Sequence, residues 1–125
     1  MLTRIFLWVN VFVLGSIGGA YLIDPNLLLG FYGLSLGSVG LDNMMRATYG
    51  GLFVGLAVLL VFAVMSTGRQ RDAVILVSVV MGGLALGRLA SLLGAGMPPS
   101  NLFGLLFYEA IVAGLGAVML FKTAR

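Results

Sequence analysis

The sequence contains no cysteine and no histidine. These absences exclude disulfide bonds, thiolate nucleophiles, imidazole general bases and the side chains that most often bind transition metals. Asp and Glu together number only 4 in 125 residues. We therefore predict no catalytic residue, no metal site and no cofactor.

Charge of either sign is also scarce, at 9% of residues, whereas hydrophobic residues make up 61%. Soluble domains carry about 25% charged residues. A domain of this size buries only about 60 to 70% of its surface, so a soluble version would expose large apolar patches. The net charge of +3 comes from single basic residues spread along the chain, which does not indicate nucleic-acid binding. Membrane lipid is the partner that this composition predicts.

Four apolar segments are long enough to cross a bilayer, because a hydrocarbon core of ~30 Å needs about 20 residues as helix. The predicted spans are residues 5–23, 45–65, 73–95 and 102–121. A β-barrel is disfavoured because residues 52–65 are apolar on every side instead of alternating. We predict one transmembrane domain over residues 1–125, an all-α four-helix bundle in which neighbouring helices are antiparallel.

The basic residues that flank the spans predict the orientation, since Lys and Arg are retained on the cytoplasmic side. Five of them would lie on one side: Arg4, Arg69, Arg71, Lys122 and Arg125. Only Arg46 lies at the opposite edge. Both termini of this multi-pass membrane protein are therefore expected in the cytoplasm.

The connection over residues 24–44 would then face outward, and it is apolar for a loop. It contains Leu27-Leu28-Leu29 and Leu34-x-Leu36. Two interpretations remain open: a short helix in the membrane interface, or a lid over an outward-facing pocket.

Small residues recur one turn apart in each span. The pairs are Gly15 with Gly19, Gly51 with Gly55, Gly83 with Gly87, and Ala110 with Gly114. In lipid, helices associate largely through close approach of backbones at small residues. These faces are expected to pack the bundle tightly, or to dock a second copy or a partner protein.

Arg88 and Glu109 lie inside apolar spans, where each would cost roughly 2.5 to 3.5 kcal/mol if it faced lipid unpaired. Arg88 lies seven residues before the third span ends at Ala95, and Glu109 lies seven residues after the fourth begins at Leu102. At ~1.5 Å per residue, both reach ~10 Å below the outer edge. Adjacent antiparallel helices therefore predict that the two side chains meet at the same depth.

Other polar residues extend this layer. Arg46 and Tyr49 open the second span, Ser91 lies one turn above Arg88, and Tyr108 adjoins Glu109. Asp42, one turn before Arg46, is placed to cap the helix or to form an i,i+4 ion pair. The predicted ligand-binding set is Arg46, Tyr49, Arg88, Ser91, Tyr108 and Glu109.

Several of these residues fall in motifs that resemble a known family. The motifs are Arg46-Ala47-Thr48-Tyr49-Gly50-Gly51, Gly87-Arg88-Leu89-Ala90-Ser91, the break from Gly96 to Asn101, and Glu109. In this order they resemble a bacterial four-span membrane family known as domain of unknown function 4345. The resemblance implies a compact four-helix protein of the bacterial inner membrane, and it implies no activity.

Three functions remain open. The favoured one is a non-enzymatic module that binds a small anionic amphiphile, lipid or quinone in an outward-facing layer with one surplus positive charge. The second is an accessory subunit of a larger membrane complex, in which Arg88 and Glu109 form an ion pair that only fixes helix docking. The third is a small transporter in which Glu109 carries protons. An enzyme is expected least, because one carboxylate and two arginines supply no nucleophile and no acid–base pair.

Overall fold

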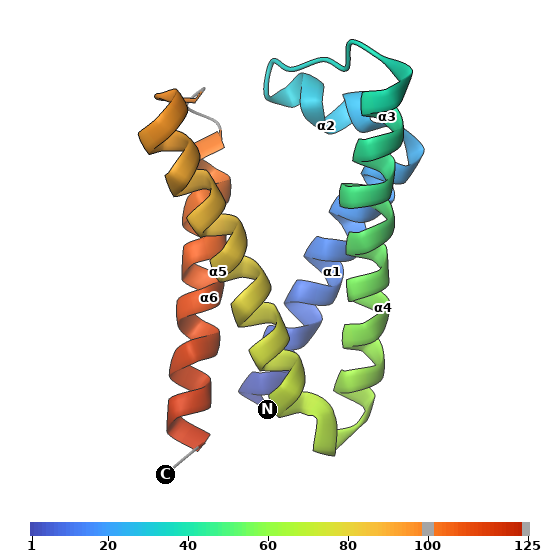
Figure 1. Cartoon of the computed structure of the whole chain (residues 1–125). Coiled ribbons are helices and arrows are strands. Elements are labelled where there is room, and N and C mark those ends of the chain that lie inside the picture. The colour runs from blue at the N-terminus through green and yellow to red at the C-terminus, as the bar shows by residue number, and fades with distance from the viewer. Residues whose placement is uncertain (99–101, 124–125) are drawn as a thin grey trace. The chain divides into compact units, whose positions relative to one another are not determined.

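The structure, a computed structural model, describes residues 1–98 and 102–123. Within these residues the chain forms helices and no β-strand. Four helical stretches are long and apolar enough to cross a membrane: Leu2–Ile23, Val39–Met65, Thr67–Ala95 and Phe103–Lys122. The all-α prediction with four membrane-length helices is therefore confirmed (Figure 1). The cytoplasmic position of both termini stays a prediction.

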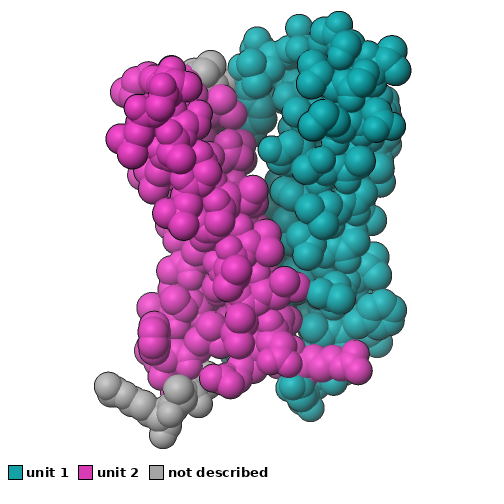
Figure 2. All heavy atoms as spheres, viewed as in Figure 1, with its two compact units in different colours: residues 1–68 teal, residues 69–125 magenta. Residues whose placement is uncertain are grey.

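Two compact units make up the chain, residues 1–68 and residues 69–125, coloured separately in Figure 2. Each unit contains two of the membrane-length stretches. The single domain over residues 1–125 stays a prediction.

In unit 1, α1 (Leu2–Ile23) packs against α4 (Leu52–Met65), which runs in the opposite direction (Figure 1). The buried residues of α1 recur at helical spacing, as Leu7, Asn10, Leu14, Gly18 and Tyr21. Those of α4 do the same, as Phe53, Ala57, Leu60, Ala63 and Val64. The core of this unit is thus the seam between one stripe of each helix.

Between the two long helices of unit 1 lie three short segments: α2 (Pro25–Phe31), α3 (Val39–Met45) and η1 (Arg46–Gly51). Asp24 begins α2, because its side chain accepts a hydrogen bond from the Asn26 N–H at 3.0 Å. Ser38 caps α3 in the same way, accepting from the Leu41 N–H at 3.2 Å. The connection between α1 and η1 therefore consists of two capped helices joined by a turn that contains Gly33 at φ 71°.

The segment η1 is a π-helix, in which the Leu52 N–H donates to the Ala47 carbonyl five residues earlier. Its Gly50 lies against α1 beside Gly18. A Cβ atom on Gly18 would lie 2.8 Å from the backbone nitrogen of Val54 and 3.0 Å from the carbonyl oxygen of Gly50. The two helix backbones approach closely at this crossing, which only glycine permits.

This crossing corrects the expectation drawn from pairs of small residues. Among the described residues, a Cβ atom on Gly19 or Gly55 would meet no atom of another element within 4 Å, and the same holds for Gly83 and Gly87. Gly15 makes an ordinary contact, with the Cβ of Ala57 at 3.7 Å. The tight contact in unit 1 therefore uses Gly18, which belongs to none of the four pairs.

In unit 2, a short 3-10 turn, η2 (Thr67–Arg69), leads into α5 (Gln70–Ala95), which packs against α6 (Phe103–Thr123). The helix α5 ends where predicted, because Gly96 adopts a φ of 90° that few other residues tolerate. Residues 99–101 of the predicted break and the predicted cytoplasmic Arg125 lie outside the described residues.

Candidate functional site

The central feature of unit 2 is an ion pair between α5 and α6. Arg88 donates from Nε to both carboxylate oxygens of Glu109, at 3.0 Å to Oε1 and 2.8 Å to Oε2. The side chain of Glu109 is 6% exposed and that of Arg88 is 31% exposed. The prediction that these two side chains meet is therefore confirmed. Their depth in the membrane stays a prediction.

Both residues continue the buried stripes of their helices. Buried residues of α5 recur as Val74, Val77, Met81 and Ala85, and Arg88 follows three residues later. On α6, Glu109 is buried and lies three residues before the buried Val112. Because residues three or four apart share a helix face, the pair occupies positions that apolar side chains hold along the rest of each stripe.

The ion pair leaves the terminal nitrogens of Arg88 available for further hydrogen bonds. Arginine usually holds a carboxylate through two nitrogens of its fork. Here, among the described residues, the hydrogen bonds of the guanidinium run through Nε alone. Both terminal nitrogens, Nη1 and Nη2, can therefore donate to a further acceptor from the exposed side of the arginine.

The remaining predicted residues of unit 2 lie near the pair in sequence. Tyr108 precedes Glu109 on α6 and is half-buried, whereas Ser91 is exposed one turn beyond Arg88. The membership of Tyr108 and Ser91 in the ligand-binding set stays a prediction.

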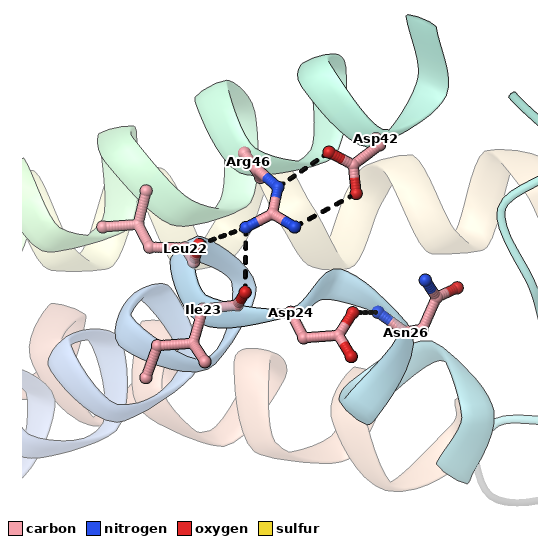
Figure 3. Close-up of polar contacts among 6 residues, drawn as sticks. All are labelled: Leu22, Ile23, Asp24, Asn26, Asp42 and Arg46. Atoms are coloured by element: carbon pink, nitrogen blue, oxygen red, sulfur yellow. Dashed lines mark hydrogen bonds and ion pairs between the residues drawn. The ribbon is translucent and has the colours of Figure 1, made fainter. Parts of the chain in front are cut away.

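Arg46 belongs to a different constellation, in unit 1 (Figure 3). It lies at the start of η1 and pairs with Asp42, with Nε 2.7 Å from Oδ2 and Nη2 3.3 Å from Oδ1. Its Nη1 donates to the backbone carbonyls of Leu22 and of Ile23, the latter at 2.9 Å. The i,i+4 pairing predicted for Asp42 and Arg46 is thus confirmed.

The two carbonyls are the last of α1, and helix ends leave such groups without intrahelical partners. A cation at this end also stabilises the helix dipole. Arg46 therefore closes the carboxyl end of α1 from another helix, while Asp42 balances its charge. No residue pattern indicated the carbonyl partners, because backbone groups are present at every position.

Tyr49 forms part of an aromatic group inside unit 1. Its ring lies 5.3 Å from that of Tyr21 on α1 and 5.6 Å from that of Phe53 on α4, measured between centroids. Such pairs contribute about 0.5 to 1.5 kcal/mol beyond their buried area. The structure thus places the predicted set in two groups, one in each unit, and the common layer that joins Arg46 to Arg88 stays a prediction.

Four membrane-length helices and an ion pair between two of them define a multi-span helical membrane protein. A family model described as Domain of unknown function (DUF4345) matches residues 2–120. The chain therefore belongs to this family, which confirms the resemblance noted in its motifs. Comparison with curated proteins and with solved structures finds no significant match.

Proposed function

We propose that the protein is a non-enzymatic membrane module that binds the polar head of a small amphiphile, a lipid or a quinone, at Arg88. One observation carries this proposal. Arg88 uses only Nε for Glu109, so the outer edge of a guanidinium inside a membrane-length helix is left to donate hydrogen bonds.

Glu109 would hold this donor in position. A long arginine side chain samples many rotamers when free, and the carboxylate fixes it at one end. Since both carboxylate oxygens bind Nε, the edge of the guanidinium formed by Nη1 and Nη2 would stay open to a ligand. The ion pair would thus pre-organise a fork of N–H groups for a carbonyl or similar acceptor.

Apolar surface for the tail of the ligand lies along the same helices. Leu89 and Leu93 on α5 and Phe107 and Ile111 on α6 are exposed large hydrophobic residues that flank the pair in sequence. In a bilayer these side chains face apolar surroundings, which an acyl or isoprenoid tail matches. A bound amphiphile would therefore keep its tail in lipid while its head contacts Arg88.

The contacts of Arg46 argue for a smaller site than the predicted set of residues. The predicted surplus of positive charge required Arg46 to be available, but this arginine pairs with Asp42 and caps α1. We therefore assign the proposed site to unit 2, on Arg88 and Glu109, and leave Arg46 and Tyr49 to hold unit 1 together.

Mass spectrometry of lipids that co-purify with the protein in a mild detergent tests the proposal. We expect wild type to retain an amphiphile and Arg88→Lys to lose it, because lysine keeps the positive charge for Glu109 but lacks the fork. Arg46→Lys is the matched control and should retain the amphiphile. Retention by Arg88→Lys, or co-purification of a fixed partner protein without any amphiphile, would contradict the proposal and favour an accessory subunit.

A further inference from the structure

We infer that Glu109 makes the Arg88 site selective for an uncharged head group that accepts hydrogen bonds, and against an anionic one. This inference rests on the proposed function. The shared chemistry is a neutral carbonyl acceptor on an apolar tail, as in a quinone or a diacylglycerol.

The first step is the local charge. Three of the four acidic residues lie at helix ends: Asp24 begins α2, Asp42 pairs with Arg46, and Asp72 lies in the first turn of α5. Glu109 is the one in the middle of a membrane-length helix. Since it neutralises Arg88, the pair carries no net charge for an anion to balance.

The second step is the effect of adding a ligand. A neutral carbonyl on Nη1 and Nη2 leaves the site neutral and gives charge-assisted hydrogen bonds. An anionic head group would leave one uncompensated negative charge in surroundings of low dielectric constant, close to the buried carboxylate. Like charges brought together at a binding site oppose association. An unpaired arginine would attract an anion, but Arg88 paired with Glu109 does not favour an anionic head group.

The third step is burial. The carboxylate of Glu109 is 6% exposed, whereas Arg88 is 31% exposed. The ligand would thus reach the arginine from its open side, with Glu109 behind it. In this position Glu109 sets the charge of the site without contacting the ligand, so it is a positioning residue and determines specificity.

Native mass spectrometry in a non-ionic detergent would measure binding of three probes, decylubiquinone, dioleoylglycerol and oleate, to wild type, Glu109→Gln and Glu109→Asp. For wild type we expect at least one neutral probe to bind at least about 10-fold more tightly than oleate. Glu109→Gln should reverse this order, because the arginine becomes an uncompensated cation. Glu109→Asp should restore the neutral preference, since it retains the negative charge.

The outcomes separate the inference from the proposed function. Binding of none of the probes by wild type would contradict both. Oleate bound by wild type as tightly as the neutral probes, with loss in Arg88→Lys, would leave the proposed function standing and overturn the inference. If Glu109→Gln does not fold, the relative affinities of wild type and Glu109→Asp for the neutral probes and oleate still test the inference. Comparison of decylubiquinone with dioleoylglycerol distinguishes a quinone from a glyceride.

Discussion

Gly18 and Gly50 contact each other across the crossing of α1 and η1. The contact is tight from both sides, since a Cβ atom on Gly50 would lie 2.8 Å from Cδ2 of Leu22 and one on Gly18 would lie 3.0 Å from the Gly50 oxygen. On the Gly18 side the nearest atoms belong to backbone, which cannot turn aside as a side chain can. This crossing lies directly below the carbonyls that Arg46 binds at the end of α1.

Gly18→Ala is therefore expected to destabilise the protein by about 1 to 3 kcal/mol, the usual cost of overpacking a tight contact. Gly19→Ala is the matched control, because a Cβ atom there meets nothing within 4 Å. Reversible unfolding in mixed detergent micelles would measure both. Equal stability of the two variants would show that α1 and η1 do not approach closely at Gly18.

Removing either partner of the ion pair in unit 2 should destabilise the protein. We expect Arg88→Gln or Glu109→Gln alone to cost about 3 kcal/mol, because each leaves a charge in an apolar span. The double variant should recover much of this loss, with a coupling free energy of about 1 to 3 kcal/mol in a double-mutant cycle. Strictly additive losses would mean that the two side chains do not interact.

Arg46→Lys should loosen the carboxyl end of α1. Lysine can pair with Asp42, but one ammonium cannot also hold the Leu22 and Ile23 carbonyls with the geometry of a guanidinium. Hydrogen exchange at the amides of residues 20–24 should become faster, while exchange in the middle of α1 stays unchanged. Asn43→Ala, an exposed position on α3, is the control, and equal exchange in both variants would contradict the role of Arg46.

Asn26→Ala should release the turn that joins α2 to α3. The side-chain Oδ1 of Asn26 accepts a hydrogen bond from the Leu36 N–H at 3.2 Å, across ten residues of chain. Losing this bond costs about 1 kcal/mol and frees Leu36 from α2, while the Leu34 N–H still donates to the Leu29 carbonyl. Limited proteolysis should then cut residues 32–38 several-fold faster than in wild type. Unchanged cleavage would show that the Asn26 side chain does not order this connection.

The absence of cysteine permits a direct test of topology. Single cysteines introduced at Thr3 and at Gly37 should be labelled by a membrane-impermeant maleimide from opposite sides of the membrane. We expect Gly37→Cys to react from outside and Thr3→Cys only after permeabilisation, because the flanking basic residues favour a cytoplasmic amino terminus. Labelling of both from one side would contradict the predicted orientation.

The apolar spans and the pairing of Arg88 with Glu109 were predictable from the sequence for physical reasons. A bilayer imposes a fixed length on each helix, so hydropathy locates the spans to within a few residues. Two spans joined by a short break must run in opposite directions, and equal distances from that break brought Arg88 and Glu109 together.

The glycine crossing was not predictable from the pairs of small residues. Such pairs occur in every span, and the face on which a helix meets its neighbour depends on the packing of the whole seam. A better signal was the buried stripe itself, since Gly18 lies four residues after Leu14 and three before Tyr21. The sequence indicated the ion pair of Arg46 with Asp42, because the two residues are four apart. It could not distinguish an arginine that caps α1 from one that binds a ligand, because that depends on where the carbonyls of α1 lie.

The π-helical turn over Arg46–Gly51 makes unit 1 sensitive to the deletion of a residue. A π turn holds one residue more than an α turn, so it rotates the residues before it by about 100° relative to those after it. Asp42 and Arg46 therefore face a different direction around the helix axis than they would if an α-helical turn led into the buried residues of α4. Loss of a single residue within the turn would keep the helix continuous but would swing the arginine away from the end of α1, so chain length at this point is constrained as well as the identities of Arg46 and Gly50.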